Sequence, residues 1–538
     1  MTPRTKKNLK ISGWSVFAGF SIALPIIAVS TSFKTQNSFD VDKIGVYIES
    51  SWRPAYEKAI EKYKEKYKDY KYDIQLLELG SFTAVELIEQ LGYSDQKVAD
   101  LIYTPIDRIP GLVENQNALV GFEKANELIS SEFSSEIYQN SSIEAFAKKG
   151  EALIRKPKPN GGFEEETTPF YFGVPHSTEA LILFYKGFSE EEISSIESIT
   201  EAVNNDKWTN SMYAFKFNDL WHGLGVLAGF INAQGGESSD VGYNGQLFGK
   251  ILVTQTSNGN YQSNMVNING VTETLEDYAN TPGWNDGGKT IETSKATEGL
   301  IKAVEWIAKY YNSAATAGNN SGVGNIKSND WLLDGNSFSP SVSALISSEK
   351  ITKAAVVDGP WQLENYNDKF TDAIPVPNLD KNGTKYIQAP GGWLYGFNQR
   401  NQLNYDKMRD MKRFLNILLT DQEVIEEQYR KAGKIVEGDV AKKTLDDSIV
   451  NKNPNTLEAK VIKAVFDSKA MDQRPDGGNA DFSQVWNAWD GNGVASTTDG
   501  VRNALQNPSL DLNSVTEILK KGLVNSFGTM LKGLRDKK

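Results

Sequence analysis

The chain has 538 residues, no cysteine, two histidines and a formal net charge of −12. The lack of cysteine excludes disulfides, cysteine zinc sites and a lipid-modified cysteine, and the negative charge argues against a nucleic-acid partner. His176 and His222 are too few and too far apart in sequence for an evident metal site or catalytic triad. We therefore expect no metal and no other cofactor. A chain of this length buries enough surface to fold without disulfides.

The N-terminal segment is basic and then apolar. The first ten residues contain four basic residues and no acidic one, and residues 11–33 carry no charge. This pattern is typical of an export signal, and residues 11–33 also exceed the roughly 20 residues that span a bilayer. Residues 1–34 are therefore predicted to be a signal peptide or a membrane anchor. The rest of the chain is expected at the extracellular face of the membrane, anchored or secreted.

Strands and helices alternate after this segment. The predicted strands are "KIGVYIE" (43–49), "YDIQLLEL" (72–79) and "ADLIYT" (99–104), and helical spacing of apolar residues predicts helices over 56–67 and 81–91. This order predicts a parallel α/β sheet, in which ligands bind beyond the carboxyl ends of the strands. Asp107 and Arg108 follow the third strand at such a place.

Further elements follow along the chain. "YFGVPHSTEALILFYKGF" (171–188) is predicted as a strand that enters a new unit, and "AAVVDGPW" (354–361) as a buried strand that ends in a turn. Helices are predicted over 294–313, as a pair over 405–433, and over 512–534. The polar stretches at about 235–293 and 311–339 are predicted loop insertions.

One insertion contains "GWNDGGKT" (Gly283–Thr290), which satisfies the phosphate-loop pattern. Such a loop follows a buried strand, but the preceding residues "VTETLEDYANTP" contain three acidic residues and a proline. We therefore expect a surface loop and no ATP site. "DKNG" (380–383) and "DGNG" (490–493) resemble the start of calcium loops but lack the spaced carboxylates, so they are predicted to be turns.

Four segments, read in order, resemble the extracytoplasmic solute-binding proteins of carbohydrate ABC importers, in particular the maltose/maltodextrin-binding branch. They are "ADLIYTPIDRIPGLVENQNALVGF", "FGVPHSTEALILFYKGF", "AAVVDGPWQLENY" and "MKRFLNILLTDQEVIEEQY". The resemblance implies an α/β, two-lobed periplasmic-binding-protein fold, with a ligand cleft between the lobes and chain crossovers that form the hinge. This chain departs from the family in its insertions, in Thr104 where the family has an aromatic residue, and in Ser51 and Trp52 where it has a polar pair.

The resemblance also divides the chain. Lobe 1 is expected to take about 40–177 and 394–440, and lobe 2 about 180–390 and 441–538. "APGGWLYGF" (Ala389–Phe397) is then a crossover, in which Gly391 and Gly392 either absorb hinge rotation or form a tight turn.

A sugar site needs flat aromatic rings for C–H faces and planar polar groups for hydroxyls. The resemblance assigns such roles to Asp107, Arg108, Glu179, Trp361 and Trp486, to Asp219 and Trp221 in "FNDLWHG", and to Trp52. Other interpretations stay open: Asp107 and Arg108 also fit a surface ion pair, and the tryptophans also fit core packing.

The implied function is that of a receptor. It binds a malto-oligosaccharide, passes it to ABC transporter permease subunits, acts as a monomer and is not an enzyme. Alternatives are a receptor for another oligosaccharide or a glycerol-phosphate-type ligand, a glycoside hydrolase with paired carboxyls, and a surface adhesin that has lost its ligand. Thr104, at an aromatic position of the family, favours the adhesin.

Overall fold

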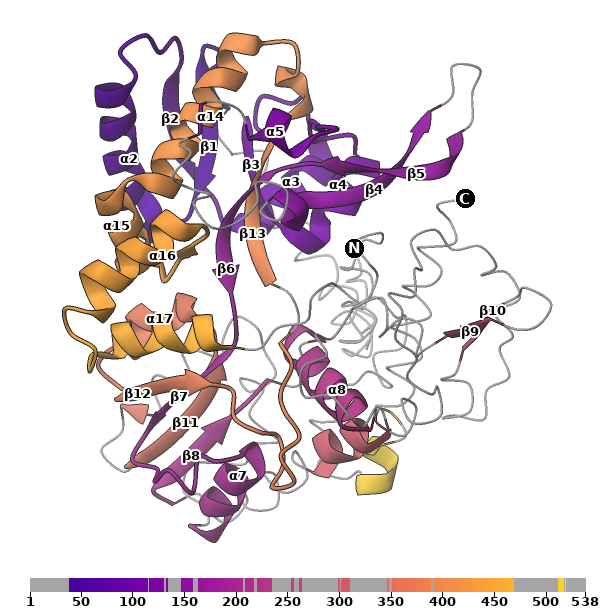
Figure 1. Cartoon of the computed structure of the whole chain (residues 1–538), viewed down its shortest axis with the longest axis vertical. Coiled ribbons are helices and arrows are strands. Elements are labelled where there is room, and N and C mark those ends of the chain that lie inside the picture. Colours follow the sequence, from indigo (N-terminus) through magenta and orange to yellow (C-terminus); the bar gives the residue numbers. More distant parts are fainter. Residues whose placement is uncertain are drawn as a thin grey trace, which may run out of the picture.

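The structure is a computed structural model that describes residues 38–114, 116–129, 132–133, 147–157, 163–206, 209–216, 220–234, 253–255, 261–263, 299, 301–309, 346–347, 351–388, 391–468, 511–516 and 518. The described elements form two lobes, each built around its own sheet (Figure 1). The N-terminal segment 1–34, the octapeptide at 283–290, Asp219 and Trp486 lie outside these residues.

The first lobe is built on a six-stranded sheet in the order β14-β6-β13-β3-β1-β2. Its strands are β1 (Lys43–Ile48), β2 (Asp73–Glu78), β3 (Leu101–Pro105), β6 (Val174–Glu179), β13 (Gly391–Phe397) and β14 (Ile435–Val436). β1 is parallel to β2 and β3, whereas β13 is antiparallel to both β3 and β6. The carboxyl ends of β1, β3 and β6 therefore share one edge of the sheet, beside the start of β13.

Helices cover both faces of this sheet, which explains why β1 is buried along nearly its whole length. Alternate residues of β1 point to opposite faces. Val46 belongs to the core cluster that contains Tyr56 and Tyr63 of α2 (Arg53–Lys66), whereas Tyr47 packs with Ile88 of α3 (Ser81–Leu91). The α3 helix has the bounds that the sequence predicts.

The predicted helical pair is α14 (Tyr405–Thr420) and α15 (Gln422–Ala432). Side chains begin both helices: Asn404 Oδ1 accepts from Lys407 N at 3.0 Å, and Asp421 Oδ1 accepts from Val424 N at 3.1 Å. α15 ends at Gly433, whose φ of +60° is a left-handed cap conformation that favours glycine. The next residues lead directly into β14, at the edge of the first-lobe sheet.

The second lobe is built on a four-stranded sheet in the order β12-β7-β11-β8. Its strands are β7 (Ile182–Lys186), β8 (Ser211–Ala214), β11 (Lys353–Asp358) and β12 (Asp372–Pro375). The helices α7 (Ile196–Asn205), α8 (Leu220–Gln234), α13 (Leu363–Tyr366) and α17 (Leu457–Asp467) belong to this lobe (Figure 1). Lys460 of α17 is paired with Asp372 of β12 at 2.5 Å.

The chain passes between the lobes from β6 to β7, from β12 to β13, and from α16 (Asp439–Leu445) and η8 (Asp446–Val450) to α17. Leu181 N donates to Gln388 Oε1 at 2.7 Å, so the first two crossovers lie side by side. The single strand predicted over 171–188 is thus two strands in different sheets. β6 ("VPHSTE") is largely polar and β7 ("ILFYK") is largely apolar, and neither pattern reveals which sheet a strand joins.

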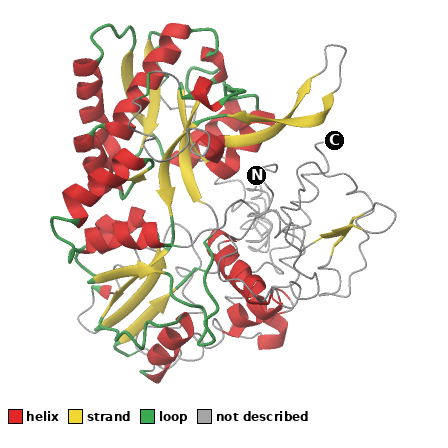
Figure 2. Cartoon of the chain, viewed as in Figure 1, coloured by secondary structure: helices red, strands yellow, loops and turns green. Residues whose placement is uncertain are grey.

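The remaining elements are peripheral. β4 (Glu151–Pro157) and β5 (Phe163–Tyr171) form an antiparallel ribbon that projects from the first lobe (Figure 2), and β9 (Val253–Gln255) pairs with β10 (Tyr261–Ser263). Short helices α4 (Ile109–Glu114) and α5 (Ala125–Leu128) belong to the first lobe. Helical residues at 299, 301–309, 512–516 and 518 fall within the helices predicted over 294–313 and 512–534. No helix in the described ranges is long and apolar enough to cross a membrane.

Candidate functional site

The carboxyl ends of the first-lobe strands meet the second lobe around the start of β13. Glu179 ends β6 and pairs in register with Gly391, while Pro105 ends β3 and pairs with Trp393. A Cβ added to Gly391 would lie 3.2 Å from Glu179 O and 2.7 Å from Trp221 Cζ2 of the second lobe. The Trp221 ring of the second lobe therefore lies against the start of β13 in the first-lobe sheet. We call this region, with Glu179 and its neighbours, the junction site.

Glu179 is the carboxylate of the junction site, and its side chain is 14% exposed. Lys434 Nζ lies 3.4 Å from Glu179 Oε1, and the Trp393 indole N–H donates a hydrogen bond to the same carboxylate. Burial raises the pKa of Glu179, while the charge of Lys434 and the hydrogen bond from Trp393 oppose this rise. The site thus holds a largely desolvated acceptor with a fixed orientation.

Three aromatic rings surround the Lys434 ammonium. Nζ lies 4.9 Å from the ring centroid of Trp52, 5.4 Å from that of Tyr103 and 5.3 Å from that of Trp393. The Tyr103 and Trp393 rings are stacked at 4.9 Å, and Trp52 meets Tyr103 edge-on at 5.1 Å. Ring faces attract cations at these distances. Lys434 and the three rings form a unit that we call the lysine cage.

Trp52, a predicted ligand-binding residue, is part of this cage. It lies in η1 (Ser50–Trp52) after β1, is 4% exposed, and stacks on Tyr56 at 6.0 Å. Its ring faces are thus covered by protein groups. The structure therefore places Trp52 at the junction site, but in the packing behind Glu179 rather than on an open surface.

Trp221 and Trp361 come to the junction site from the second lobe. Trp361 lies in η6 (Pro360–Gln362) after β11, Trp221 lies in the first turn of α8, and their ring centroids are 5.8 Å apart at 39°. Both rings are half-buried. The turn that carries Trp361 also touches the first lobe, because a Cβ added to Gly433 would lie 2.7 Å from Trp361 Cα.

Asp107 and Arg108 lie in η2 (Ile106–Arg108), directly after β3 and beside the start of β13. Both side chains are half-buried. Arg108 Nη1 lies 3.7 Å from Glu89 Oε1 of α3, so the ion pair of Arg108 is made with α3. Of the eight predicted site residues, Asp219 and Trp486 lie outside the described residues, and the other six lie at or near this edge of the first-lobe sheet.

Several junction residues were missed in the sequence: Glu49, Tyr103, Trp393 and Lys434. Glu49 follows β1 and accepts a hydrogen bond from Ser81 Oγ at 2.7 Å. Phe82 of α3, 57% exposed, meets Trp393 edge-on at 5.1 Å and lies on the rim of the same cluster. The available signal was that Glu49 directly follows β1 and that Tyr103 lies near the carboxyl end of β3.

Neither histidine is part of an evident catalytic arrangement. His176 is buried; its Nε2 bonds with Gln428 Oε1 at 2.7 Å, and its Nδ1 lies 3.3 Å from Tyr103 OH. Burial and the nearby Lys434 lower the pKa of His176 to about 3, so the ring is neutral near pH 7. Within the described part of the chain no group of carboxylates and histidines forms a metal site.

Of the two segments that resemble calcium loops, the structure describes only "DKNG" (380–383). The "DKNG" segment is a turn, in which the Asp380 carboxylate accepts from Asn382 N, Thr384 N and Thr384 Oγ1 at 2.9–3.1 Å. "DGNG" (490–493) lies outside the described residues. Gly391 and Gly392 begin the strand β13 rather than forming a tight turn, and the ring of Trp221 lies close against Gly391.

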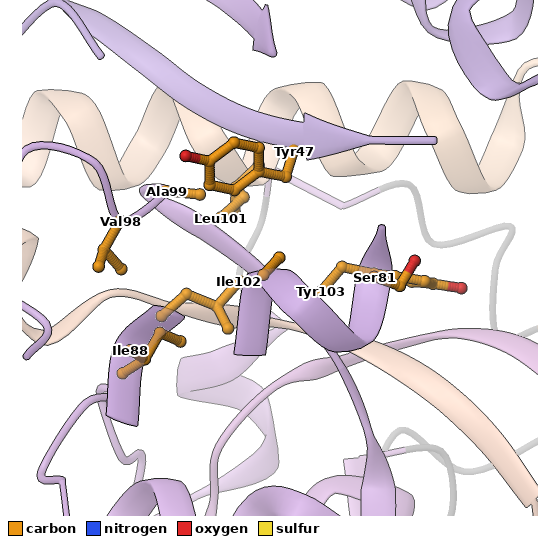
Figure 3. A pocket seen from close by; sticks show the side chains of 9 residues that line it. Tyr47, Ser81, Ile88, Val98, Ala99, Leu101, Ile102 and Tyr103 are labelled. Atoms are coloured by element: carbon orange, nitrogen blue, oxygen red, sulfur yellow. The ribbon is translucent and has the colours of Figure 1, made fainter. Parts of the chain in front are cut away.

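A small cavity lies in the first lobe between α3 and strands β1 and β3 (Figure 3). Tyr47, Ile88, Ile102 and Tyr103 are among its lining residues. Its free volume of about 10 Å³ for the centre of a water-sized molecule accommodates one water at most. This cavity is too small for a sugar, so it is not the candidate site.

No family model matches the sequence, and no curated protein matches it either. Solved structures do share its fold. MalX from Streptococcus pneumoniae in complex with maltopentaose has a TM-score of 0.51 at 16% identity, over 91% of this chain and 99% of that chain. The maltose-binding periplasmic protein MalE from Listeria monocytogenes, in complex with maltose, has a TM-score of 0.50 at 14% identity, over 93% of this chain and 100% of that chain.

The Thermus thermophilus maltotriose-binding protein, bound with maltotriose, has a TM-score of 0.51 at 14% identity, over 91% of this chain and 99% of that chain. These matches agree with the two sheets and the crossovers described above. The chain therefore has the two-lobed α/β fold of the periplasmic maltose- and maltodextrin-binding proteins.

Proposed function

We propose that this protein is an extracytoplasmic sugar receptor, which binds a malto-oligosaccharide between its lobes and delivers it to the permease subunits of an ABC transporter. The observation that carries the proposal is the position of the Trp221 ring, which lies beside Trp361 in the second lobe and against Gly391, the residue that pairs in register with Glu179 of the first lobe. Aromatic faces and a charged acceptor are the two group types that a neutral sugar requires. Solved structures of proteins with the same fold hold maltose, maltotriose and maltopentaose.

The proposed binding roles follow from the chemistry of each group. Trp361 and Trp221 stack on the sugar rings, and Glu179 accepts hydrogen bonds from sugar hydroxyls. Hydrogen bonds to charged groups contribute about 1.5–3 kcal/mol each. Asp107 and Arg108 contribute further polar contacts from the end of β3, Trp52 supports Glu179 from behind, and Trp486 and Asp219 remain predicted contacts.

Binding is proposed to be coupled to lobe closure. The proposed first lobe comprises about 40–177 and 394–440, extended through α16 and η8 to the third crossover. The proposed second lobe comprises about 180–390 and the residues from α17 onward. Rotation about the crossovers brings the tryptophans of one lobe against a sugar held by the other, and closure excludes water from the hydrogen bonds. In this role the protein catalyses no reaction, acts as a monomer, and works at the extracellular face of the membrane, with residues 1–34 as its export signal or anchor.

Isothermal titration calorimetry of the chain without residues 1–34 tests the proposal. The ligands are maltose, maltotriose and maltopentaose, with cellobiose, lactose and glycerol 3-phosphate for comparison. We expect binding of the malto-oligosaccharides that Trp361→Ala weakens at least about tenfold, since stacking and burial of an aromatic ring contribute more than 1.4 kcal/mol. Tyr405→Ala is the matched control, because Tyr405 is an 80% exposed ring on α14.

The outcome separates the alternatives. Heat from glycerol 3-phosphate alone would indicate another ligand class, and no heat from any ligand would favour an adhesin. Chromatography of the titrated maltopentaose gives a second readout: intact sugar supports a receptor, while shortened products would identify a glycoside hydrolase and refute the proposal.

A further inference from the structure

We infer that Lys434 is a positioning residue, which holds the Glu179 carboxylate in its charged form and in one orientation as the acceptor for ligand hydroxyls. This inference rests on the proposed function and deepens it. Lys434 has no counterpart among the site residues that the sequence indicates, and it enters the junction site from the segment between α15 and β14.

The position of the Lys434 ammonium is fixed from several directions. Trp52, Tyr103 and Trp393, which come from three separate segments, place their ring centroids 4.9–5.4 Å from Nζ. The residue is 9% exposed, so its charge is shielded from bulk water. Cation–π attraction offsets part of the cost of removing an ammonium from water. Because the rings are themselves buried, Lys434 has little freedom to turn away from Glu179.

The Glu179 carboxylate is held from two sides and retains acceptor capacity. An ionised carboxylate offers about four lone-pair sites. Lys434 Nζ, at 3.4 Å from Oε1, and the Trp393 indole N–H use two of them. As far as the described residues are concerned, the other sites remain for hydroxyl donors. A protonated acid would instead present an O–H, and its acceptor capacity would fall.

The groups around Glu179 make its protonation state depend on Lys434. Burial favours the protonated acid, and the negative charge of Glu49, at the end of β1, acts in the same direction. His176 on β6 is neutral near pH 7, and burial keeps Tyr103 on β3 neutral as well. The positive charge of Lys434 opposes these influences, together with the Trp393 hydrogen bond.

Arg108, a further cation near this edge, is paired with a residue of α3. Arg108 Nη1 lies 3.7 Å from Glu89 Oε1 on α3. A replacement of Lys434 by a neutral residue is therefore expected to shift the Glu179 equilibrium towards the protonated acid.

The test uses Lys434→Met, which keeps an unbranched apolar chain of similar length and removes the charge. Lys434→Arg restores a cation, and Lys431→Met, at an exposed position three residues earlier on α15, removes the same charge outside the cage. Maltotriose binding is measured by calorimetry at pH 6.0 and pH 8.5. Carbon-13 NMR of the Glu179 side-chain carboxyl, assigned with Glu179→Gln, gives its pKa in the sugar-free protein.

In Lys434→Met we expect the affinity to fall by a larger factor between pH 8.5 and pH 6.0 than in the wild type, because a higher Glu179 pKa leaves a smaller charged fraction at the lower pH. Lys431→Met should show the same pH dependence of maltotriose affinity as the wild type. Lys434→Arg should restore most of the affinity that Lys434→Met loses at pH 6.0. The NMR pKa of Glu179 should rise by at least about one unit in Lys434→Met alone among the lysine variants.

An equal loss of affinity at both pH values, with an unchanged Glu179 pKa, would overturn the inference and make Lys434 a direct ligand contact or a packing residue. If the wild type binds no malto-oligosaccharide, the proposed function fails by itself. The NMR titration then still decides whether Lys434 controls the charge of Glu179, and an unchanged pKa would refute that as well.

Discussion

Gly433 is the residue at which a single added methyl group should separate the lobes. It ends α15 with φ at +60°, and an added Cβ would lie 2.1 Å from Pro360 O and 2.7 Å from Trp361 Cα. Both neighbours are backbone atoms of the turn after β11, so no side-chain rotation relieves the clash. Gly433→Ala must therefore displace either the cap of α15 or the turn that carries Trp361.

The magnitude follows from two separate costs. The left-handed conformation costs a non-glycine residue about 1–2 kcal/mol, and overpacking costs typically a further 1–3 kcal/mol, so Gly433→Ala should lower the free energy of unfolding by about 2–5 kcal/mol. Gly92 is the control for a glycine with open space around it. It ends α3 with φ at +80° and ψ at +156°, a region almost confined to glycine that costs another residue about 1–3 kcal/mol, and an added Cβ would meet nothing within 4 Å. Gly92→Ala should show the backbone cost without the clash.

Urea unfolding of both variants measures these costs, and small-angle X-ray scattering of the sugar-free proteins reports the separation of the lobes. We expect Gly433→Ala to lose more stability than Gly92→Ala and to give a larger radius of gyration. Equal losses in the two variants, with unchanged scattering, would show that the turn after β11 yields freely. The contact between Gly433 and the second lobe would then have no role in setting the lobe arrangement.

Three further predictions concern single side chains. Gly391→Ala should displace Trp221, because the added Cβ would lie 2.7 Å from its ring. The displacement should change the near-UV circular dichroism that arises from the Trp221–Trp361 pair, and an unchanged spectrum would contradict this prediction. His176 is neutral in the folded protein and charged below pH about 6.5 in the unfolded chain, so stability falls as pH decreases, by about 2.6 kcal/mol between pH 7 and 4.5. Urea unfolding of His176→Asn at both pH values should lack this part of the loss, and the reasoning fails if wild type and variant lose equally. Burial lowers the pKa of Lys412 to about 8, so the unfolded chain binds more protons above that pH, and stability should rise by roughly 1.5 kcal/mol from pH 8 to 9.5. The same titration of Lys412→Met should show no such rise; a parallel rise would assign the effect to other groups.

Local sequence signals were sufficient for most secondary structure around the site. The helical patterns of the sequence predicted α3 and the pair of α14 and α15, because such patterns act within one or two turns. Sheet membership was not predictable in the same way. The strand predicted over 171–188 spans the link between β6 and β7, and only tertiary pairing with β13 or β11 divides it.

Residues of the candidate site were predictable only where they belong to a recognisable sequence segment or directly follow a predicted strand. Glu179 and Trp361 were indicated by segments with a family pattern, and Asp107 by its place after a strand. Lys434 had no such signal, since a lysine just beyond a helix end normally interacts with the helix dipole in solvent. Its burial depends on Trp52, Tyr103 and Trp393, which are distant in sequence and meet only in the folded sheet.

The central place of β13 has a consequence for how the chain acquires its structure. This strand hydrogen-bonds β3 on one side and β6 on the other, yet it is synthesised after the four strands of the second-lobe sheet. Until residues 391–397 arrive, β3 and β6 have unpaired edges, which are prone to aggregation and proteolysis. A chain truncated before Gly391 should therefore fail to assemble the first-lobe sheet, although the chain up to that point contains every strand of the second-lobe sheet.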